Sequence, residues 1–353
     1  MSKNLRERFN ILAAPPAGWR ESYFRNNDGQ NIRYGYAPST DTKKGTILLT
    51  HGYGESTDIY FETIKEYQKR GYDIWAMDWA GMGKSDSDSP HAKKRPAPKD
   101  FSRHVYDMDT FINTVVKRDA SKPFLMSTHS FGGHIGLLYL EKHKKTFDGA
   151  IMSAPMFDLT RAGLPPLFRK PIRFLFNVLS KAGLKDTPIP TTYQLLGRAD
   201  NKDENIVDIK INKKTPESLR ADWKQLSRKW NPDTELERPT FGWVAVAYDT
   251  IETSLMPDSL KEIETPILIG SAGYEDLVDN RAHKKVANTL GDKATLVKIE
   301  DANHNLFHDT DKVHKEWWNH ISSFLKKTEG TNPLISVKKA ANDGKNFPNR
   351  KQA

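Results

Sequence analysis

The chain contains no cysteine among its 353 residues. This absence excludes disulfide bridges, thiolate metal sites and a cysteine nucleophile, and it gives no support to a secreted fold built on disulfides. Long hydrophobic runs are missing too, because no stretch approaches the roughly 20 apolar residues of a membrane-spanning helix. The first apolar run, Ile11 to Ala14, is too short for a signal-peptide core. We therefore expect a cytoplasmic protein, with peripheral association with a membrane left open.

Hydrophobic residues are scarce, at 37% of the chain, and the 54 lysines and arginines exceed the 45 acids to give a net charge of +9. A basic excess is typical of proteins that bind nucleic acid, anionic membranes or acidic substrates, and also of ordinary charged surfaces. Because the chain has neither a zinc-finger nor an RNP-type motif, we expect no nucleic-acid partner. An anionic membrane remains a candidate partner, and the oligomeric state stays open.

Short apolar runs alternate with helical patterns, which predicts βαβ units around a mostly parallel sheet flanked by helices, the α/β class of fold. The alternation fails at about 156–264, where prolines and helical patterns replace buried strands. We predict an α/β core over 1–155 and 265–327, an inserted helical cap over 156–264, and a basic, disordered tail over 328–353. The predicted strands are 46–50, 73–78, 124–127, 150–153, 266–270 and 294–299, and the predicted helices are 59–70, 102–117, 132–143, 280–290 and 311–326.

The segment Phe124–Gly133 reads FLMSTHSFGG, a short apolar strand that runs into Ser130, two glycines and a helical pattern. A serine at such a strand–helix turn is held in a strained backbone with its hydroxyl exposed at the carboxyl edge of the sheet. Gly132 lets the backbones pass closely, but Thr128 stands where the G-x-S-x-G form has glycine. The elbow must therefore open slightly, or Thr128 must point into free space. We predict Ser130 as a nucleophile.

An oxyanion hole needs two backbone donors, and the segment THGYGE at Thr50–Glu55 follows a predicted strand directly. We assign the backbone N–H groups of Tyr53 and Phe131. His51, in the same turn, is expected to be structural.

The order of residues in this kind of enzyme is serine, acid, histidine. His304 follows the last predicted strand and can take the proton from Ser130, and we prefer it to His308 because it lies nearer the strand end. The acid should follow the strand at 266–270, where GYEDLVDN holds three carboxylates. Chemistry alone does not choose among them: Glu275, Asp276 and Asp279.

Several motifs occur together in an order that resembles the monoacylglycerol-lipase-like α/β-hydrolases, in particular their bacterial lysophospholipase branch. The resemblance covers about residues 20–326 and implies Ser130 as nucleophile, His304 as base and Glu275 as acid, because the family acid lies four residues before an aspartate, here Asp279. The motifs are THGYGE at 50–55, DWAGMGKSD at 78–86, THSFGG at 128–133, APMF at 154–157, PTFGW at 239–243, and the segments 273–280 and 302–304.

Three positions depart from the family pattern. Thr128 replaces a glycine, Ala80 replaces an arginine, and Asn305 follows the base where the branch has glutamate. The first could reshape the nucleophile elbow, while the other two concern the support of the loops.

The sequence therefore predicts a serine carboxylic-ester hydrolase that acts through an acyl-enzyme, without metal or cofactor, on monoacylglycerols or lysophospholipids. Thioesterase, peptidase and acyltransferase chemistry are the alternatives on the same fold, and a non-catalytic ligand receptor is the alternative from another class. A dehalogenase or epoxide hydrolase would carry aspartate in place of Ser130.

The segment Leu167–Leu184 in the predicted cap is apolar at helical spacing and basic at its flanks. Such a helix can pack on the core and line an acyl pocket, or it can lie on anionic lipid. The predicted apolar face holds Phe168, Ile172, Leu175, Phe176, Leu179 and Leu184, and the flanking cations are Arg169, Lys170, Arg173, Lys181 and Lys185.

Overall fold

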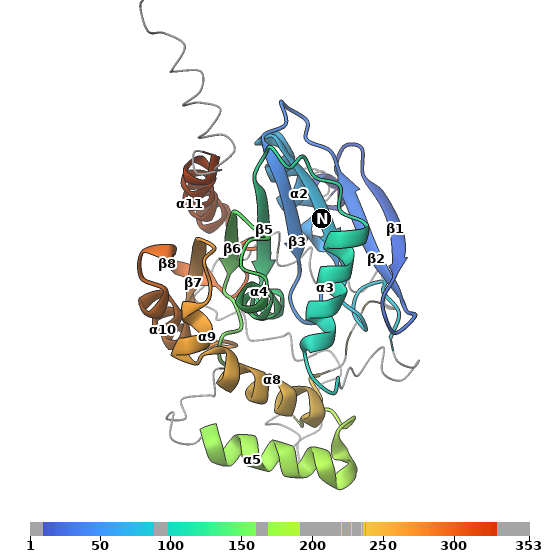
Figure 1. Cartoon of the computed structure of the whole chain (residues 1–353), viewed down its shortest axis with the longest axis vertical. Coiled ribbons are helices and arrows are strands. Elements are labelled where there is room, and N and C mark those ends of the chain that lie inside the picture. Colours follow the sequence, from blue (N-terminus) through green and yellow to red (C-terminus); the bar gives the residue numbers. More distant parts are fainter. Residues whose placement is uncertain are drawn as a thin grey trace, which may run out of the picture.

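The computed structural model describes residues 10–87, 98–159, 169–190 and 238–329, together with 220, 227, 234 and 236. Its centre is an eight-stranded sheet of order β1-β2-β4-β3-β5-β6-β7-β8 (Figure 1). Pairs that involve β1 or β2 are antiparallel, and the others are parallel. The strands are β1 (Arg20–Arg25), β2 (Asn31–Ala37), β3 (Gly45–Thr50), β4 (Tyr72–Met77), β5 (Phe124–His129), β6 (Gly149–Ser153), β7 (Ile267–Tyr274) and β8 (Ala294–Asn303).

Helices cover both faces of the sheet, so the predicted α/β-hydrolase architecture with its mostly parallel sheet is confirmed. In strand β5, Phe124 and Met126 face one hydrophobic cluster and Leu125 faces the other. This alternation explains why the inner strands read as continuous apolar runs. The helices are η1 (Thr57–Tyr60), α2 (Phe61–Lys69), α3 (Ser102–Thr114), α4 (Phe131–Lys142), α5 (Arg169–Leu179), η3 (Ser180–Leu184), α8 (Phe241–Ser254), α9 (Pro257–Lys261), α10 (Asn280–Leu290), η5 (Gly291–Lys293) and α11 (Asp311–Glu329).

Each of the six predicted strand runs overlaps one of β3 to β8, with 78 and 266 just outside the observed strands, but β1 and β2 were not predicted. These two strands form an antiparallel extension at one edge of the sheet. All of β1 except Phe24 is exposed, so the strand has too few apolar residues for the buried-run signal that identifies the inner strands.

Helices α5 and α8 belong to the predicted cap and lie together at one end of the molecule, away from α11 (Figure 1). The remaining cap residues are largely outside the described ones, so the cap boundaries stay a prediction. Most of the predicted tail, 330–353, also lies outside the described residues, whereas α11 continues to Glu329 and buries Thr328. No helix in the described ranges combines the length and the apolar character needed to cross a membrane.

Candidate active site

Ser130 joins β5 to α4 with a left-handed backbone conformation, φ 49° and ψ −114°. An L-residue adopts such a conformation only when its surroundings compensate for the strain. Here the Ser130 N–H donates to the carbonyl of Ser153 at 3.0 Å, and the Ser130 carbonyl accepts from the N–H of Met156 at 2.9 Å. The elbow is therefore fastened to the end of the neighbouring strand β6 on both sides of the serine side chain.

The two glycines after Ser130 are required by close contacts. A Cβ on Gly132 would lie 2.7 Å from the carbonyl oxygen of His51, and a Cβ on Gly133 would lie 2.5 Å from Cβ of Pro155. The first turn of α4 thus packs directly against the loop after β3 and the loop after β6.

Thr128 is buried, and its side chain faces glycines of α4 and does not point into free space. Its methyl group lies 3.4 Å from the position of a Cβ on Gly136, one turn along α4, and its hydroxyl lies 3.4 Å from that of Gly133. Because residues 133 and 136 of α4 are glycines, the helix leaves room for the Thr128 side chain. The Thr128 hydroxyl has no hydrogen-bond partner among the described residues.

The structure brings the three predicted triad side chains together. His304 Nε2 lies 2.8 Å from Ser130 Oγ, and His304 Nδ1 lies 2.8 Å from Glu275 Oε2. Ser130 follows β5, Glu275 follows β7 and His304 follows β8, so the three side chains meet at the carboxyl edge of the parallel strands. This is the hydrogen-bonded relay that a serine nucleophile, an imidazole base and an orienting carboxylate require.

The Glu275 carboxylate is held in its charged form. Burial works to raise its pKa, but the nearby His304 and hydrogen bonds from the N–H groups of Leu277 and Val278 outweigh burial, and the pKa is lowered. The two N–H groups lie 2.9 and 3.2 Å from Glu275 Oε1, which leaves Oε2 for His304. The acid can thus stabilise a positive imidazolium without taking its proton.

The other candidates from the sequence lie elsewhere. Asp276 is exposed, and Asp279 caps α10 by accepting from the N–H of Arg281 at 2.9 Å while also pairing with its guanidinium. His308 Nε2 lies 3.0 Å from the carbonyl of Ile59, and no contact with Ser130 is present in the described part of the chain. The geometry therefore favours Glu275 and His304 over these alternatives.

The loop after β3 lies against the nucleophile elbow: a Cβ on Gly52 would be 3.3 Å from Cβ of Ser130. Phe131 is the first residue of α4, and the first N–H groups of a helix lack partners within the helix. Donation by Tyr53 and Phe131 to an oxyanion stays a prediction. His51 is buried, with Nδ1 2.8 Å from the carbonyl of Gly52, which is a supporting position within the loop.

Glu55, a buried carboxylate beneath this loop, was not predicted as a functional residue. It accepts from the N–H of Gly52 at 2.9 Å, the hydroxyl of Tyr60 at 2.6 Å and the amide of Asn305 at 3.3 Å. Burial and Glu55 together raise the pKa of Tyr60 well above its usual value. Glu55 thus links the predicted oxyanion loop to the residue after His304.

The structure accounts for two of the departures from the family pattern, each by a different contact. Asn305 donates to Glu55, where a glutamate would place a second carboxylate against the first. Ala80 lies in the main hydrophobic cluster with only 7% of its surface exposed, a site that suits a methyl group.

A second serine–histidine contact is buried close to the loop that carries Glu275. Ser271 Oγ in β7 lies 2.6 Å from Nδ1 of His283 in α10, and His283 Nε2 lies 2.7 Å from the carbonyl of Pro155. Burial lowers the pKa of His283 to about 4, so the ring is neutral at physiological pH. Within the described residues, no group of three or more His, Asp or Glu side chains could hold a metal ion.

Comparison with known proteins identifies the family to which the chain belongs. Residues 41–311 match the protein family described as serine aminopeptidase, S33. The chain is 25% identical over 305 residues to a probable lysophospholipase L2 of Haemophilus influenzae, covering 84% of this chain and 89% of that one. It is 30% identical over 190 residues to a monoglyceride lipase of Saccharomyces cerevisiae, covering 52% of this chain and 58% of that one.

Among solved structures, a soluble variant of the Saccharomyces cerevisiae monoglyceride lipase with a substrate analog superposes with a TM-score of 0.65 at 22% identity. The superposition covers 88% of this chain and 96% of that one. At this identity the likeness shows the shared fold, and the sequence family rests on the match over residues 41–311. The resemblance to the lipase-like α/β-hydrolases is thereby confirmed, and the chain belongs to the serine aminopeptidase S33 family of that fold.

Proposed function

We propose that the protein hydrolyses carboxylic esters of monoacylglycerols or lysophospholipids through an acyl-enzyme on Ser130. The observation that carries the proposal is the pair of 2.8 Å contacts that join His304 to Ser130 and to Glu275. The named activities of the relatives, lysophospholipase and monoglyceride lipase, support the substrate class.

In the first half of the reaction, Ser130 Oγ attacks the ester carbonyl while His304 Nε2 takes the hydroxyl proton. The C–O bond to the leaving alcohol then breaks, and His304 returns the proton to that alcohol. His304 then deprotonates a water molecule, which attacks the acyl carbonyl. The bond between that carbon and Ser130 Oγ breaks, His304 returns the proton to Ser130, and the fatty acid leaves. Glu275 holds the imidazole in the required tautomer, and the N–H groups of Tyr53 and Phe131 would stabilise the oxyanion of each intermediate.

A peptidase activity is the second candidate, because the matching family is described as a serine aminopeptidase. The same side chains could cleave an amide. A panel of monoacylglycerols, lysophospholipids, thioesters and aminoacyl p-nitroanilides separates these possibilities, and we expect the first two to give the highest kcat/KM.

The catalytic assignment is tested with Ser130→Ala and His304→Ala. We expect each to lower ester hydrolysis by roughly 10⁴-fold or more, because members of a triad act as a unit. Ser130→Ala should also abolish labelling by a fluorophosphonate, while circular dichroism shows a folded protein. Near-wild-type turnover by the Ser130→Ala protein would refute the proposal.

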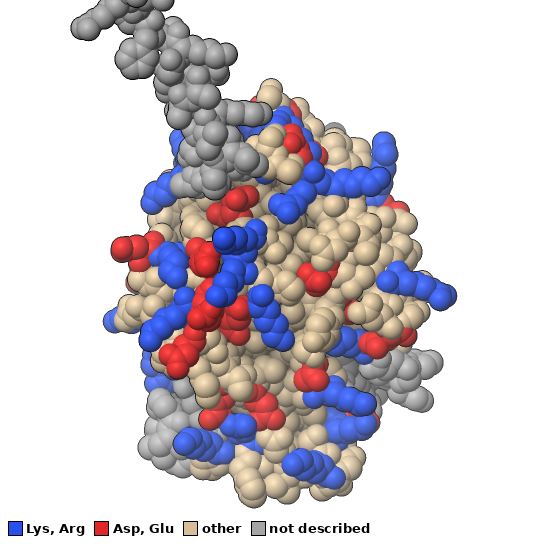
Figure 2. Space-filling view, viewed as in Figure 1, with Lys and Arg blue, Asp and Glu red and all other residues tan. Residues whose placement is uncertain are grey.

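We also propose peripheral contact between the cap helix α5 and an anionic membrane surface. Three apolar side chains of α5 are exposed: Phe174 by 72%, Leu175 by 52% and Val178 by 44%. Lys170 of α5 and Lys181 of the adjoining η3 are exposed, and they lie four residues before Phe174 and three residues after Val178, the spacing of neighbours on a helix surface. In the view of Figure 2, charged and uncharged side chains alternate along the lower edge of the molecule, where α5 lies in Figure 1.

An apolar strip flanked by lysines is the composition that inserts into the headgroup layer of anionic lipid. Such a contact would bring the cap to the membrane that holds the lipid substrate. Vesicle sedimentation at low and high salt tests the contact, and location in the cytoplasm stays a prediction from the sequence.

A further inference from the structure

The motif PTFGW at Pro239–Trp243 begins the cap helix α8, and the chemistry described above assigns it no role. Each of its residues makes a defined contact. The Pro239 carbonyl accepts from the N–H of Ile189 at 3.0 Å, and the Phe241 N–H donates to the carbonyl of Thr187 at 3.0 Å. These bonds pair the motif with the chain that follows η3 and fix where α8 starts.

The next two contacts set the direction of the helix. The Thr240 hydroxyl accepts from the N–H of Trp243 at 3.1 Å and caps α8. The N–H of Gly242 donates to the carbonyl of Lys185 at 2.9 Å, and a Cβ there would lie 2.8 Å from the same oxygen. Residue 242 must therefore be glycine for Trp243 to take its place.

Trp243 lies against both residues whose N–H groups are the predicted oxyanion donors. Its ring centroid is 4.6 Å from that of Tyr53 and 5.8 Å from that of Phe131. The indole is only 3% exposed. One cap side chain thus contacts the two halves of the predicted oxyanion hole, which come from different loops.

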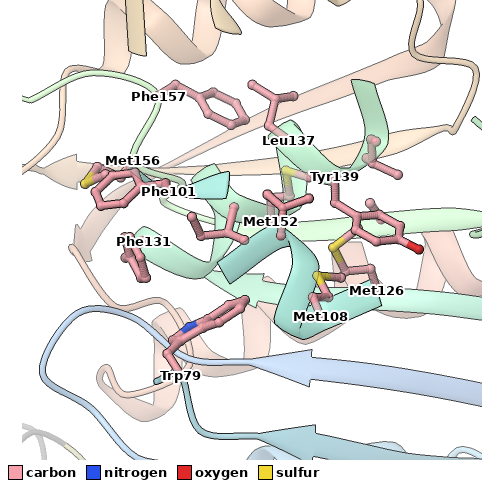
Figure 3. Close-up of a cluster of buried hydrophobic side chains, with 14 of the residues drawn as sticks. Trp79, Phe101, Met108, Met126, Phe131, Leu137, Tyr139, Met152, Met156 and Phe157 are labelled. Carbon is pink, nitrogen blue, oxygen red and sulfur yellow. The ribbon is translucent and has the colours of Figure 1, made fainter. Parts of the chain in front are cut away.

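The position of Phe131 is fixed on its other sides by core rings. Figure 3 shows Phe131 between Phe101 and Trp79, whose centroids lie 5.1 and 5.9 Å away. Tyr53 is half-buried in a loop that contains Gly52 and Gly54. Because Trp243 contacts both rings, it can hold Tyr53 at a fixed distance from Phe131.

We propose that Trp243 is a positioning residue for the oxyanion hole, through which cap helix α8 sets the spacing of the Tyr53 and Phe131 backbone donors. The inference rests on the proposed function, since it assumes that Ser130 generates an oxyanion. Trp243 contacts the rings of Tyr53 and Phe131, and it acts by fixing the positions of these two residues relative to each other.

The test compares Trp243→Phe and Trp243→Leu with a matched control, Phe241→Leu. Phe241 belongs to the same motif but packs on Phe176 of α5, with ring centroids 5.6 Å apart. We expect Trp243→Leu to lower kcat roughly 10–100-fold with KM within about twofold, because small displacements of oxyanion donors cost rate rather than binding. Trp243→Phe should lose less, and the control should keep its kcat.

Inhibitor binding separates positioning from a merely structural role. A long-chain trifluoromethyl ketone forms a hemiketal oxyanion with Ser130. The secondary alcohol of the same chain length, with a methyl group in place of the trifluoromethyl group, fills the pocket without forming an oxyanion. Trp243→Leu should weaken the ketone by the same factor as kcat and leave the affinity for the alcohol unchanged. Equal loss of both ligands, or a rise in KM with unchanged kcat, would make Trp243 a pocket wall and overturn the inference.

Two further outcomes are decisive. If Trp243→Leu does not fold, Trp243→Phe keeps an aromatic ring at the contact, and unchanged kcat and ketone affinity in that variant would overturn the inference. If the wild-type protein neither hydrolyses esters nor binds the ketone, the proposed function itself fails, which is distinct from a functional wild type whose Trp243 variants behave normally.

Discussion

The carboxyl edge of the sheet and cap helix α5 differ in how far their side chains are buried and hydrogen-bonded. At the sheet edge, Ser130, Glu275 and His304 hold one another through hydrogen bonds, and strands β3 to β6 are completely buried. Among the described residues, helix α5 is fastened on the side that faces α8, where Arg173 pairs with Asp249 and Glu252.

The outer side of α5 leaves large apolar residues in solvent. The contrast suggests a division of work: the rigid strand ends carry chemistry common to many esters, and the cap determines which substrates and surfaces meet them. Each variant below changes one of the two regions. A loss of catalysis from a change on the outer side of α5, or a loss of vesicle binding from a change at the strand ends, would contradict this division.

Beyond Ser130 and His304 themselves, the largest effect is expected at the acid of the sheet edge. Glu275→Gln should lower kcat on the order of 10³-fold or more, because a neutral amide no longer stabilises the imidazolium or fixes its tautomer. Asp279→Asn is the matched control, since asparagine also caps helices, and it should lose no more than a few-fold. Steady-state kinetics on both proteins decide. A collapse in Asp279→Asn with mild loss in Glu275→Gln would move the acid.

The choice of acid illustrates the limit of the sequence. Inner strands are apolar on both faces and therefore appear in the sequence as continuous apolar runs. The residues that follow these runs, among them Ser130 and His304, are thereby predicted to lie at the carboxyl edge of the sheet. Three neighbouring carboxylates in one loop could not be separated by chemistry. Their separation depends on the turn geometry, in which the N–H groups of Leu277 and Val278 bind one oxygen of Glu275 and direct the other toward His304.

The predicted face of α5 was wrong in part for a similar reason. Helical spacing grouped Leu175 with Phe176, yet Phe176 is 6% exposed and Leu175 is 52% exposed. The pattern shows that a helix has an apolar side, but the partner helix α8 and the Arg173 ion pairs decide which side is buried. Arg173 is therefore not available as a surface cation. Phe168 lies outside the described residues, as does the side chain of Ile172.

The second expected effect concerns acid stability of the core. The pKa of buried His283 is lowered from 6.5 to about 4, so the unfolded chain binds a proton below pH 6.5 that the folded chain excludes until about pH 4. The stability contributed by neutral His283 is complete above pH 6.5 and is lost progressively as pH falls toward 4, on the order of 3 kcal/mol in total.

Urea unfolding at several values between pH 7 and pH 4 should show this loss, and His283→Gln should flatten it. His134 and His314 act in the same direction, because burial lowers their pKa values to about 3 and about 4. Some acid sensitivity will therefore remain in the variant. Identical pH profiles for wild type and His283→Gln would contradict the neutral, buried histidine.

A smaller effect is expected where α4 accommodates Thr128. A Cβ on Gly136 would lie 2.8 Å from Sδ of Met126 and 3.4 Å from the methyl group of Thr128. Gly136→Ala should therefore destabilise the fold by about 1–3 kcal/mol through overpacking. In a Thr128→Gly background the same substitution should cost less, because the Thr128 methyl group, one of the three nearest neighbours within 4 Å of that Cβ, is gone. Chemical denaturation of the two single variants and the double variant gives the coupling, and strict additivity would show that Thr128 does not depend on Gly136.

The smallest effect is expected on the outer side of α5, where no reaction step is at stake. Lys170→Glu with Lys181→Glu should weaken sedimentation with anionic vesicles roughly tenfold or more, since each basic side chain near such a surface contributes about 1 kcal/mol. Lys315→Glu with Lys326→Glu on α11 is the matched control, because it changes the net charge equally at exposed positions away from α5 and keeps the basic C-terminal segment.

Salt should remove the difference between the two double variants, as the Debye length falls from about 10 Å at 0.1 M to about 3 Å at 1 M. Neither double variant should change kcat on a short, water-soluble ester, because the charges lie outside the site. If the α5 variant binds vesicles as well as the wild type, or if the α11 control loses equally, the contact with lipid is not made through α5. The exposed strip would then act only within the cap, and the cap would select substrate without positioning the enzyme on the membrane.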